Sequence, residues 1–102
     1  MSRPDSLATR MPTPARTVVG AEVLVIDQDP RIHDGITPLL TAAELHVTCV
    51  ADPAAGRALV KDKFFSVVLV DLDTPVPSAG VDTIRELHAA SPTTVILALT
   101  PR

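Results

Sequence analysis

Residues 67–75 read VVLVDLDTP, an apolar run followed by an aspartate and a short polar turn. The run is too short for a typical helix, and its uninterrupted aliphatic character predicts a strand that is buried on both faces of a parallel sheet. Asp71 follows the run directly. Because open α/β sheets bind their ligands at the carboxyl ends of the strands, Asp71 is the first candidate for a functional residue.

Strand-like and helix-like segments alternate on both sides of this run. The apolar segments at 22–26 and 95–99 predict two more buried strands, and the alternating segment at 47–50 predicts a strand near an edge of the sheet. Aspartate-proline pairs at 29–30 and 52–53 mark the starts of two helices, and Gly80 precedes a third. The alternation predicts an α/β fold, with four parallel strands and three crossover helices.

The predicted helices have apolar faces that should point toward the sheet. Helical spacing places Ile32 and Leu39 on the inward face of the first helix, and Val81 on that of the third. Pro38 lies inside the first predicted helix, where it removes one backbone hydrogen bond and should kink the helix.

Composition narrows the possible functions. The chain has 102 residues, enough for one domain, and 46% of them are hydrophobic, which excludes a wholly disordered chain. The net charge of −3 argues against nucleic-acid binding by this segment. No apolar run approaches the ~20 residues of a membrane span. The N-terminus lacks the charged-then-apolar pattern of a secretion signal, so we expect a cytoplasmic protein.

Residues 1–20 differ in composition from the rest of the chain. They contain three prolines and several arginines, and they show no apolar periodicity. This composition is typical of a flexible leader. The predicted folded domain therefore comprises residues 21–102.

Three predicted strands end in groups that can bind a cation or a phosphoryl group. Asp27, Gln28 and Asp29 follow the first strand, Asp71 follows the third, and Thr100 follows the last. Clustered carboxylates repel one another unless a cation joins them, and hard oxygen ligands with room for water suit Mg²⁺. A carboxylate beside Mg²⁺ can attack phosphorus, and a nearby hydroxyl can then hydrogen-bond the phosphoryl oxygens. Asp29 also has a simpler interpretation as a helix N-cap.

The same residues resemble those of a known family, the receiver domains of bacterial two-component response regulators. The stretch VLVIDQDP at 23–30 resembles the first strand and acidic pocket of that family. VVLVDLDTP resembles its third strand, with the phosphoacceptor aspartate at Asp71 and the following proline at Pro75. Gly80 resembles the glycine that opens the third helix, and VILALT at 95–100 resembles the fourth strand with its hydroxyl residue, Thr100. The resemblance extends over residues 21–102 and implies a flavodoxin-like sheet.

The resemblance implies a signalling domain in a phosphorelay rather than an enzyme. A histidine kinase or phosphotransfer protein would deliver a phosphoryl group to Asp71, and Thr100 would hydrogen-bond that group and take part in a switch. The implied Mg²⁺ ligands are the carboxylates of Asp27 and Asp71 and the backbone carbonyl of Asp73. The second member of the family's acidic pair falls on Gln28, whose neutral oxygen should weaken Mg²⁺ binding. Either Gln28 or Asp29 could be a further Mg²⁺ ligand.

The family's last helix, strand and helix have no counterpart in these residues, so the resemblance is to a C-terminally truncated receiver. The strand at 95–99 would then be an exposed apolar edge, which predicts self-association or a partner that completes the fold. Two other functions remain open. One is a pseudo-receiver that binds proteins without being phosphorylated, and the other is a small α/β hydrolase or phosphatase that uses the same carboxylates.

Overall fold

The computed structural model describes residues 20–74, 76 and 79–99. Nearly all of the predicted leader, as well as Pro75 and Thr100, lies outside the described residues. Strands and helices alternate along the chain, and their bounds are β1 (Glu22–Ile26), α3 (Pro30–Ala42), β2 (His46–Val50), α4 (Pro53–Asp62), β3 (Val67–Asp71), α5 (Ala79–Ala90) and β4 (Val95–Leu99).

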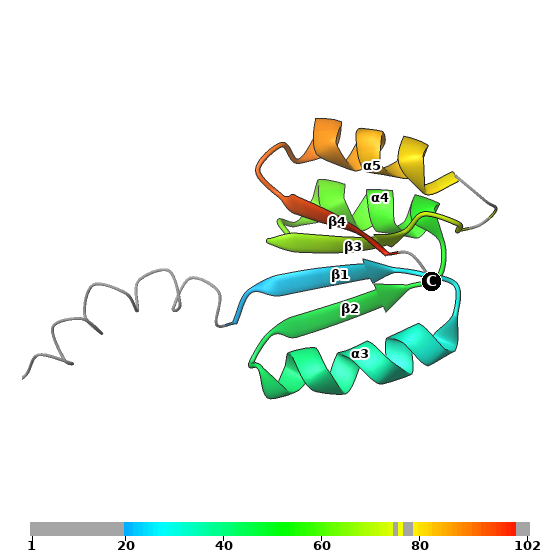
Figure 1. Ribbon diagram of the computed structural model, residues 1–102. Helices are drawn as coiled ribbons and strands as arrows, with labels where there is room; N and C mark the ends of the chain where they lie inside the picture. Colours follow the sequence, from blue (N-terminus) through cyan, green and yellow to red (C-terminus); the bar gives the residue numbers. More distant parts are fainter. Residues whose placement is uncertain (1–19, 75, 77–78, 100–102) are drawn as a thin grey trace, which may run out of the picture.

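The four strands form one parallel sheet in the order β2-β1-β3-β4. Helix α3 covers one face of the sheet, and α4 and α5 lie side by side on the other (Figure 1). This arrangement confirms the predicted flavodoxin-like fold of four strands and three crossover helices. Among the described residues, no helix is long and apolar enough to cross a membrane.

The two central strands, β1 and β3, supply the core because both of their faces are covered. On the side of α4 and α5, alternate residues of these strands pack with side chains from the two helices and with Phe65, and the buried members are Leu24, Ile26, Val60, Phe65, Val68, Val70 and Leu87. On the side of α3 the buried cluster is smaller: Val23, Val25 and Leu69. The continuous apolar runs in the sequence therefore reflect burial on both faces, as expected for a parallel sheet.

Helices α3 and α4 begin where the sequence predicts, whereas α5 begins at Ala79, so Gly80 lies inside it rather than before it. Asp29 caps α3 and Asp52 caps α4, each accepting a hydrogen bond from the backbone N–H two residues later, at 2.9 and 3.2 Å. Each cap is followed by proline at the first helical position, where its missing N–H costs nothing. Helix α3 runs through Pro38 to Ala42 as one element.

The predicted inward faces of two helices are wrong in part. Leu39 is 71% exposed and Ile32 is 37% exposed, because α3 packs mainly on β2 and turns these side chains toward an open groove. In α5 the buried stripe is Gly80, Thr83 and Leu87, so Val81, about 100° further around the helix, is 43% exposed.

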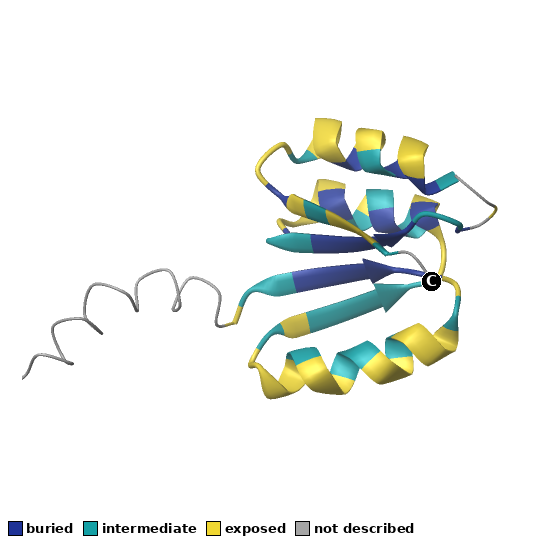
Figure 2. Cartoon of the chain, in the orientation of Figure 1, coloured by how far each residue is buried: buried dark blue, intermediate teal, exposed yellow. Residues whose placement is uncertain are grey.

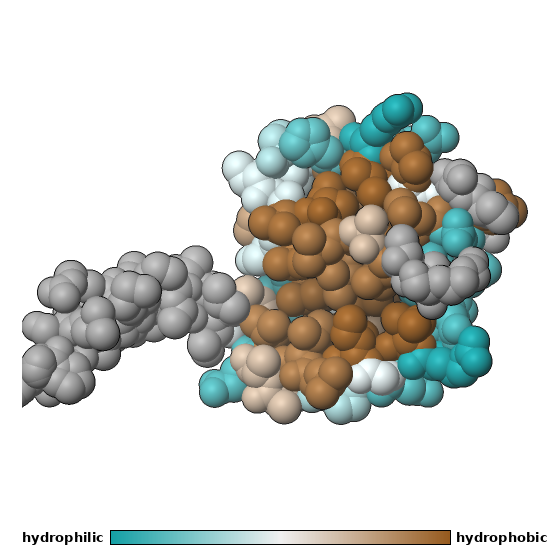
Figure 3. Space-filling view, in the orientation of Figure 1, coloured by the Kyte–Doolittle hydropathy of each residue, from teal (hydrophilic) through white to brown (hydrophobic). Residues whose placement is uncertain are grey.

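The sheet is poorly covered at its β4 end on the α3 side. Within the described chain β4 pairs only with β3, and its side chains Val95 and Leu97 are about half exposed, at 54% and 50%. Figure 2 shows the contrast between the buried central strands and the exposed β4. Figure 3 shows apolar surface extending across the strands between β4 and α3. Strand β4 therefore has more apolar side chains than the described part of the chain buries.

Candidate functional site

The carboxyl ends of β1 and β3 bring two aspartates together. The strands are direct neighbours, and their register pairs Ile26 with Val70. Asp27 follows Ile26 and Asp71 follows Val70, so the two aspartates lie at the same edge of the sheet. Both are buried, with exposed fractions of 4% and 8%. The parallel pairing thus places two acids, 44 positions apart in the printed sequence, in one site.

The carboxyl group of Asp27 is held near the sheet by the loop that follows β1. Its Oδ1 accepts a hydrogen bond from the backbone N–H of Asp29 at 2.9 Å. Burial raises the pKa of Asp27, and the negative charges of Asp71 and Asp29 raise it further. A cation bound between the carboxylates would relieve this repulsion, so the electrostatics of the site favour a positive ligand.

Asp29 is engaged by its own neighbour rather than pointing freely toward a ligand. Arg31 binds both carboxylate oxygens through Nε at 3.1 and 3.2 Å, and its Nη2 donates to Oδ2 at 2.8 Å. These hydrogen bonds, together with the one from the Arg31 backbone, lower the pKa of Asp29. Its N-cap role is confirmed. The neighbouring Gln28 is exposed. Because Arg31 occupies the carboxylate of Asp29, Gln28 is the more available of the two further candidates for a metal ligand.

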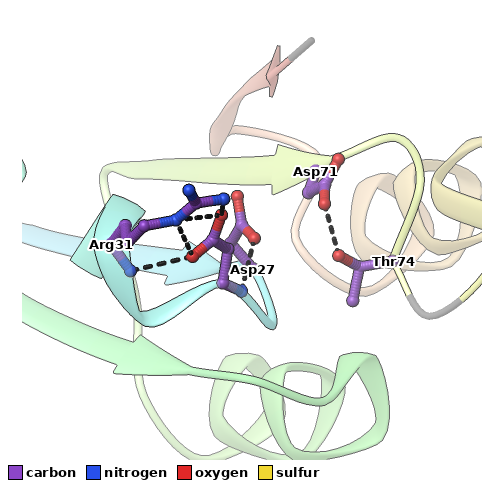
Figure 4. A network of polar contacts seen from close by, with 5 residues as sticks. Asp27, Arg31, Asp71 and Thr74 are labelled. Atoms are coloured by element: carbon purple, nitrogen blue, oxygen red, sulfur yellow. Dashed lines mark hydrogen bonds and ion pairs between the residues drawn. The ribbon is translucent and has the colours of Figure 1, made fainter. Parts of the chain in front are cut away.

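The loop after β3 holds both oxygens of Asp71. Oδ1 accepts the backbone N–H of Asp73 at 2.9 Å, and Oδ2 accepts the hydroxyl of Thr74 at 2.5 Å. Figure 4 shows Thr74 reaching the carboxylate from the side away from Asp27. Sequence reasoning missed Thr74. A hydroxyl residue three positions after a strand-end aspartate was the available signal, because serine and threonine often bond locally in such turns.

An open cavity of about 350 Å³ adjoins the carboxylates. Asp27, Asp29, Arg31 and Asp71 form its polar end. Gly35 and apolar side chains from α3 and from the end of β4 form the rest, and these side chains are Ile32, Ile36, Leu39 and Leu99. The last described residue of β4 thus reaches the same cavity as Asp71, while the predicted hydroxyl residue, Thr100, lies outside the described residues.

The donor set fits a magnesium ion that keeps most of its water. Within the described part of the chain, no three His, Cys, Asp or Glu side chains converge on one metal position. Two close carboxylates remain, and Mg²⁺ is commonly bound by one or two carboxylates with water completing the shell. Burial, together with the charges of Asp71 and Asp29, raises the pKa of Asp27, and a bound cation would favour its charged form. Asp27 and Asp71 therefore suit a hydrated Mg²⁺ better than a dehydrated metal with many protein ligands.

Comparison with known proteins identifies what this arrangement resembles. The family model described as the response regulator receiver domain matches residues 23–102. Among curated proteins, none matches the chain significantly in sequence.

Solved structures of receivers have the same fold. The chemotaxis response regulator CheY4 of Vibrio cholerae is 26% identical, with a TM-score of 0.73, over 80% of this chain and 69% of that chain. The receiver domain of a sensor histidine kinase of Pseudomonas aeruginosa, solved with a magnesium ion in its active-site cleft, is 27% identical, with a TM-score of 0.71, over 80% and 68% of the two chains. RcsB of Salmonella enterica, at 24% identity and a TM-score of 0.68 over 79% and 48%, shares the fold.

Proposed function

The chain belongs to the response regulator receiver domain family, and we propose that Asp71 accepts a phosphoryl group from a histidine kinase or a phosphotransfer protein. The observation that supports this most directly is the pair of buried carboxylates, Asp27 and Asp71, at one edge of an open cavity. Asp71 ends β3, whose sequence resembles the family's phosphoacceptor strand. The proposed role is phosphorelay signalling, in the cytoplasm, rather than enzymatic turnover.

The proposed chemistry needs few groups of the protein. A carboxylate oxygen of Asp71 forms a bond to phosphorus while the bond between phosphorus and the donor breaks, and the electron pair leaves with the donor. Asp27 and Asp71, with the backbone carbonyl of Asp73 and the amide oxygen of Gln28, would hold Mg²⁺. When bound, this ion supplies charge neutralisation between the carboxylates and the incoming phosphoryl group. We propose that the hydroxyl group of Thr100 donates a hydrogen bond to the phosphoryl oxygens.

The test of the proposal is covalent labelling of the wild-type protein. Incubation with Mg²⁺ and acetyl phosphate should increase the intact mass by one phosphoryl group. Omitting Mg²⁺ or adding a chelator should prevent the increase. If the wild-type mass stays unchanged under conditions that label a full-length receiver, the pseudo-receiver alternative is favoured. Sustained release of inorganic phosphate from phosphoesters, at many turnovers per chain, would instead favour a hydrolase.

We predict that Gln28→Asp tightens Mg²⁺ binding by about tenfold, because metal affinity follows the number of charged ligands. Gln28 is exposed and follows Asp27 directly in the chain, so the added carboxylate needs no buried space. Isothermal titration calorimetry with Mg²⁺ measures the change. The matched control is Thr93→Asp, which adds the same charge at an exposed position in the loop before β4, at the opposite edge of the sheet. If both variants bind Mg²⁺ more tightly by the same factor, the gain in affinity comes from net charge and not from a ligand at position 28.

We further propose that the chain associates with itself through β4 and the apolar surface beside it. Val95 and Leu97 are half exposed, and Leu39 and Leu99 line the open cavity next to the end of β4. An apolar strand with an unpaired edge is a common site of association.

Sedimentation equilibrium should therefore show a mass above that of the monomer, rising with protein concentration. Leu97→Lys should return the protein to a monomer, since a lysine on an edge strand opposes pairing. Ala90→Lys, at an exposed position of α5, should leave the association unchanged. A wild-type protein that remains monomeric at high concentration contradicts self-association and favours a different protein as the completing partner.

A further inference from the structure

The side chain of Thr74 contacts the carboxylate that we propose as the phosphoacceptor. Its hydroxyl donates to Oδ2 of Asp71 at 2.5 Å, and Thr74 itself is 1% exposed (Figure 4). Water cannot reach the hydroxyl to compete for this bond. The other oxygen, Oδ1, accepts the backbone N–H of Asp73 at 2.9 Å. The turn after β3 thus restrains both oxygens of the reacting group.

The strength of the Thr74 bond depends on the charge of Asp71. A hydrogen bond to a carboxylate is about twice as strong as one between neutral groups. Phosphoryl transfer joins one carboxylate oxygen to phosphorus, and the former carboxylate becomes a neutral acyl group. The negative charge now lies on the phosphoryl oxygens. The bond from Thr74 to Asp71 is therefore strongest before transfer and weakens as the new bond to phosphorus forms.

We propose that Thr74 is a positioning residue that holds Asp71 in its unphosphorylated form and slows phosphoryl transfer. This inference rests on the proposed function of Asp71. An interaction that is stronger in the ground state than in the transition state raises the barrier to reaction. The difference between a charge-assisted and a neutral hydrogen bond corresponds to about threefold to tenfold in rate. Thr74 would in this way set how readily the domain responds to a donor.

Two substitutions separate the hydroxyl from the shape of the side chain. Thr74→Val keeps the branched shape and removes the donor, so it should raise the initial rate of mass gain from acetyl phosphate by about threefold to tenfold. Thr74→Ser keeps the donor and removes the methyl group, so it should retain the wild-type rate. A role in packing alone predicts the reverse, with the larger effect in the serine variant. Urea unfolding of each variant confirms that the folded protein is being compared, and Thr74→Ala replaces the valine variant if that one does not fold.

Each outcome decides the inference. A faster valine variant with a serine variant like wild type supports it. Equal rates in all three proteins, or a slower valine variant, overturn it while leaving Asp71 as the phosphoacceptor. A slower valine variant would mean that the hydroxyl assists transfer, for example by turning to the phosphoryl oxygens. If neither wild type nor any Thr74 variant gains mass, the phosphoacceptor proposal fails, and the inference about Thr74 fails with it.

Discussion

Asp71→Asn is expected to abolish the gain of a phosphoryl group from acetyl phosphate. Asparagine has nearly the same shape as aspartate, and its amide oxygen can still accept the backbone N–H of Asp73. The fold should therefore persist, but a neutral amide is a poor nucleophile toward phosphorus and holds Mg²⁺ less strongly than a carboxylate does. Intact mass after incubation with donor and Mg²⁺ measures the loss. Peptide mapping of the labelled wild-type protein should place the phosphoryl group on the peptide that contains Asp71.

The control for this variant makes the same chemical change far from the site. Asp62→Asn removes one carboxylate at the exposed end of α4 and should leave labelling at the wild-type level. If labelling persists in Asp71→Asn at an undiminished rate, another residue accepts the group. Asp27 would then be the first alternative, because it is the other buried carboxyl group lining the cavity.

Gly80→Ala is expected to lower the free energy of unfolding by about 1–3 kcal/mol, as overpacking of a tight contact does. A Cβ atom at this position would lie 2.5 Å from Cα of Leu72 and 2.7 Å from the backbone oxygen of Asp71. Both atoms belong to the backbone, so no side chain can rotate away to make room. The backbone N–H of Gly80 also donates to the carbonyl of Leu72 at 2.8 Å, which ties the start of α5 to the end of β3.

The matched control is a second glycine in a helix. Gly35 lies on the exposed surface of α3, and a Cβ atom there would meet nothing within 4 Å. Gly35→Ala should therefore raise the free energy of unfolding by about 0.5–1 kcal/mol, because alanine is the better helix former. Urea unfolding with unchanged slopes measures both effects. Destabilisation of similar size in the two variants would show that the contact at Leu72 is not the cause.

The same contact links stability to the site. The turn between β3 and α5 carries Asp73 and Thr74, whose hydrogen bonds orient the Asp71 carboxylate. If Gly80→Ala moves the start of α5 away from Leu72, the turn must move too. We therefore expect any phosphoryl uptake by the Gly80→Ala variant to be slower than its fraction of folded protein accounts for.

Local patterns were sufficient to predict the fold and the two central acids. Continuous aliphatic runs predicted β1, β3 and β4 because a strand covered on both faces needs apolar side chains at every position. Alternation with helices then required parallel pairing, and parallel pairing brings strand ends to one edge. The proximity of Asp27 and Asp71 follows from these rules, without knowledge of any contact between them.

The contacts around the site could not be read in the same way. Arg31 binding Asp29, and Thr74 binding Asp71, depend on how each loop turns after its strand. Loop geometry depends on side-chain hydrogen bonds over two or three residues, which many polar sequences can make equally well. The sequence therefore predicted that Asp27 and Asp71 share one edge of the sheet, but it did not identify Arg31 and Thr74 as hydrogen-bond donors beside them.

The inward faces of α3 and α5 show a second limit of sequence patterns. Apolar spacing predicted that Leu39 and Val81 face the sheet, yet both are exposed. Spacing identifies a helix and its apolar stripe, but it does not say which part of the stripe has a partner. That depends on the angle at which the helix docks and on what covers the neighbouring strands. The strand order and the acidic edge thus follow from periodicity along the chain. The open groove beside β4 and the restraint on Asp71 depend on packing between distant segments, which only the tertiary structure determines.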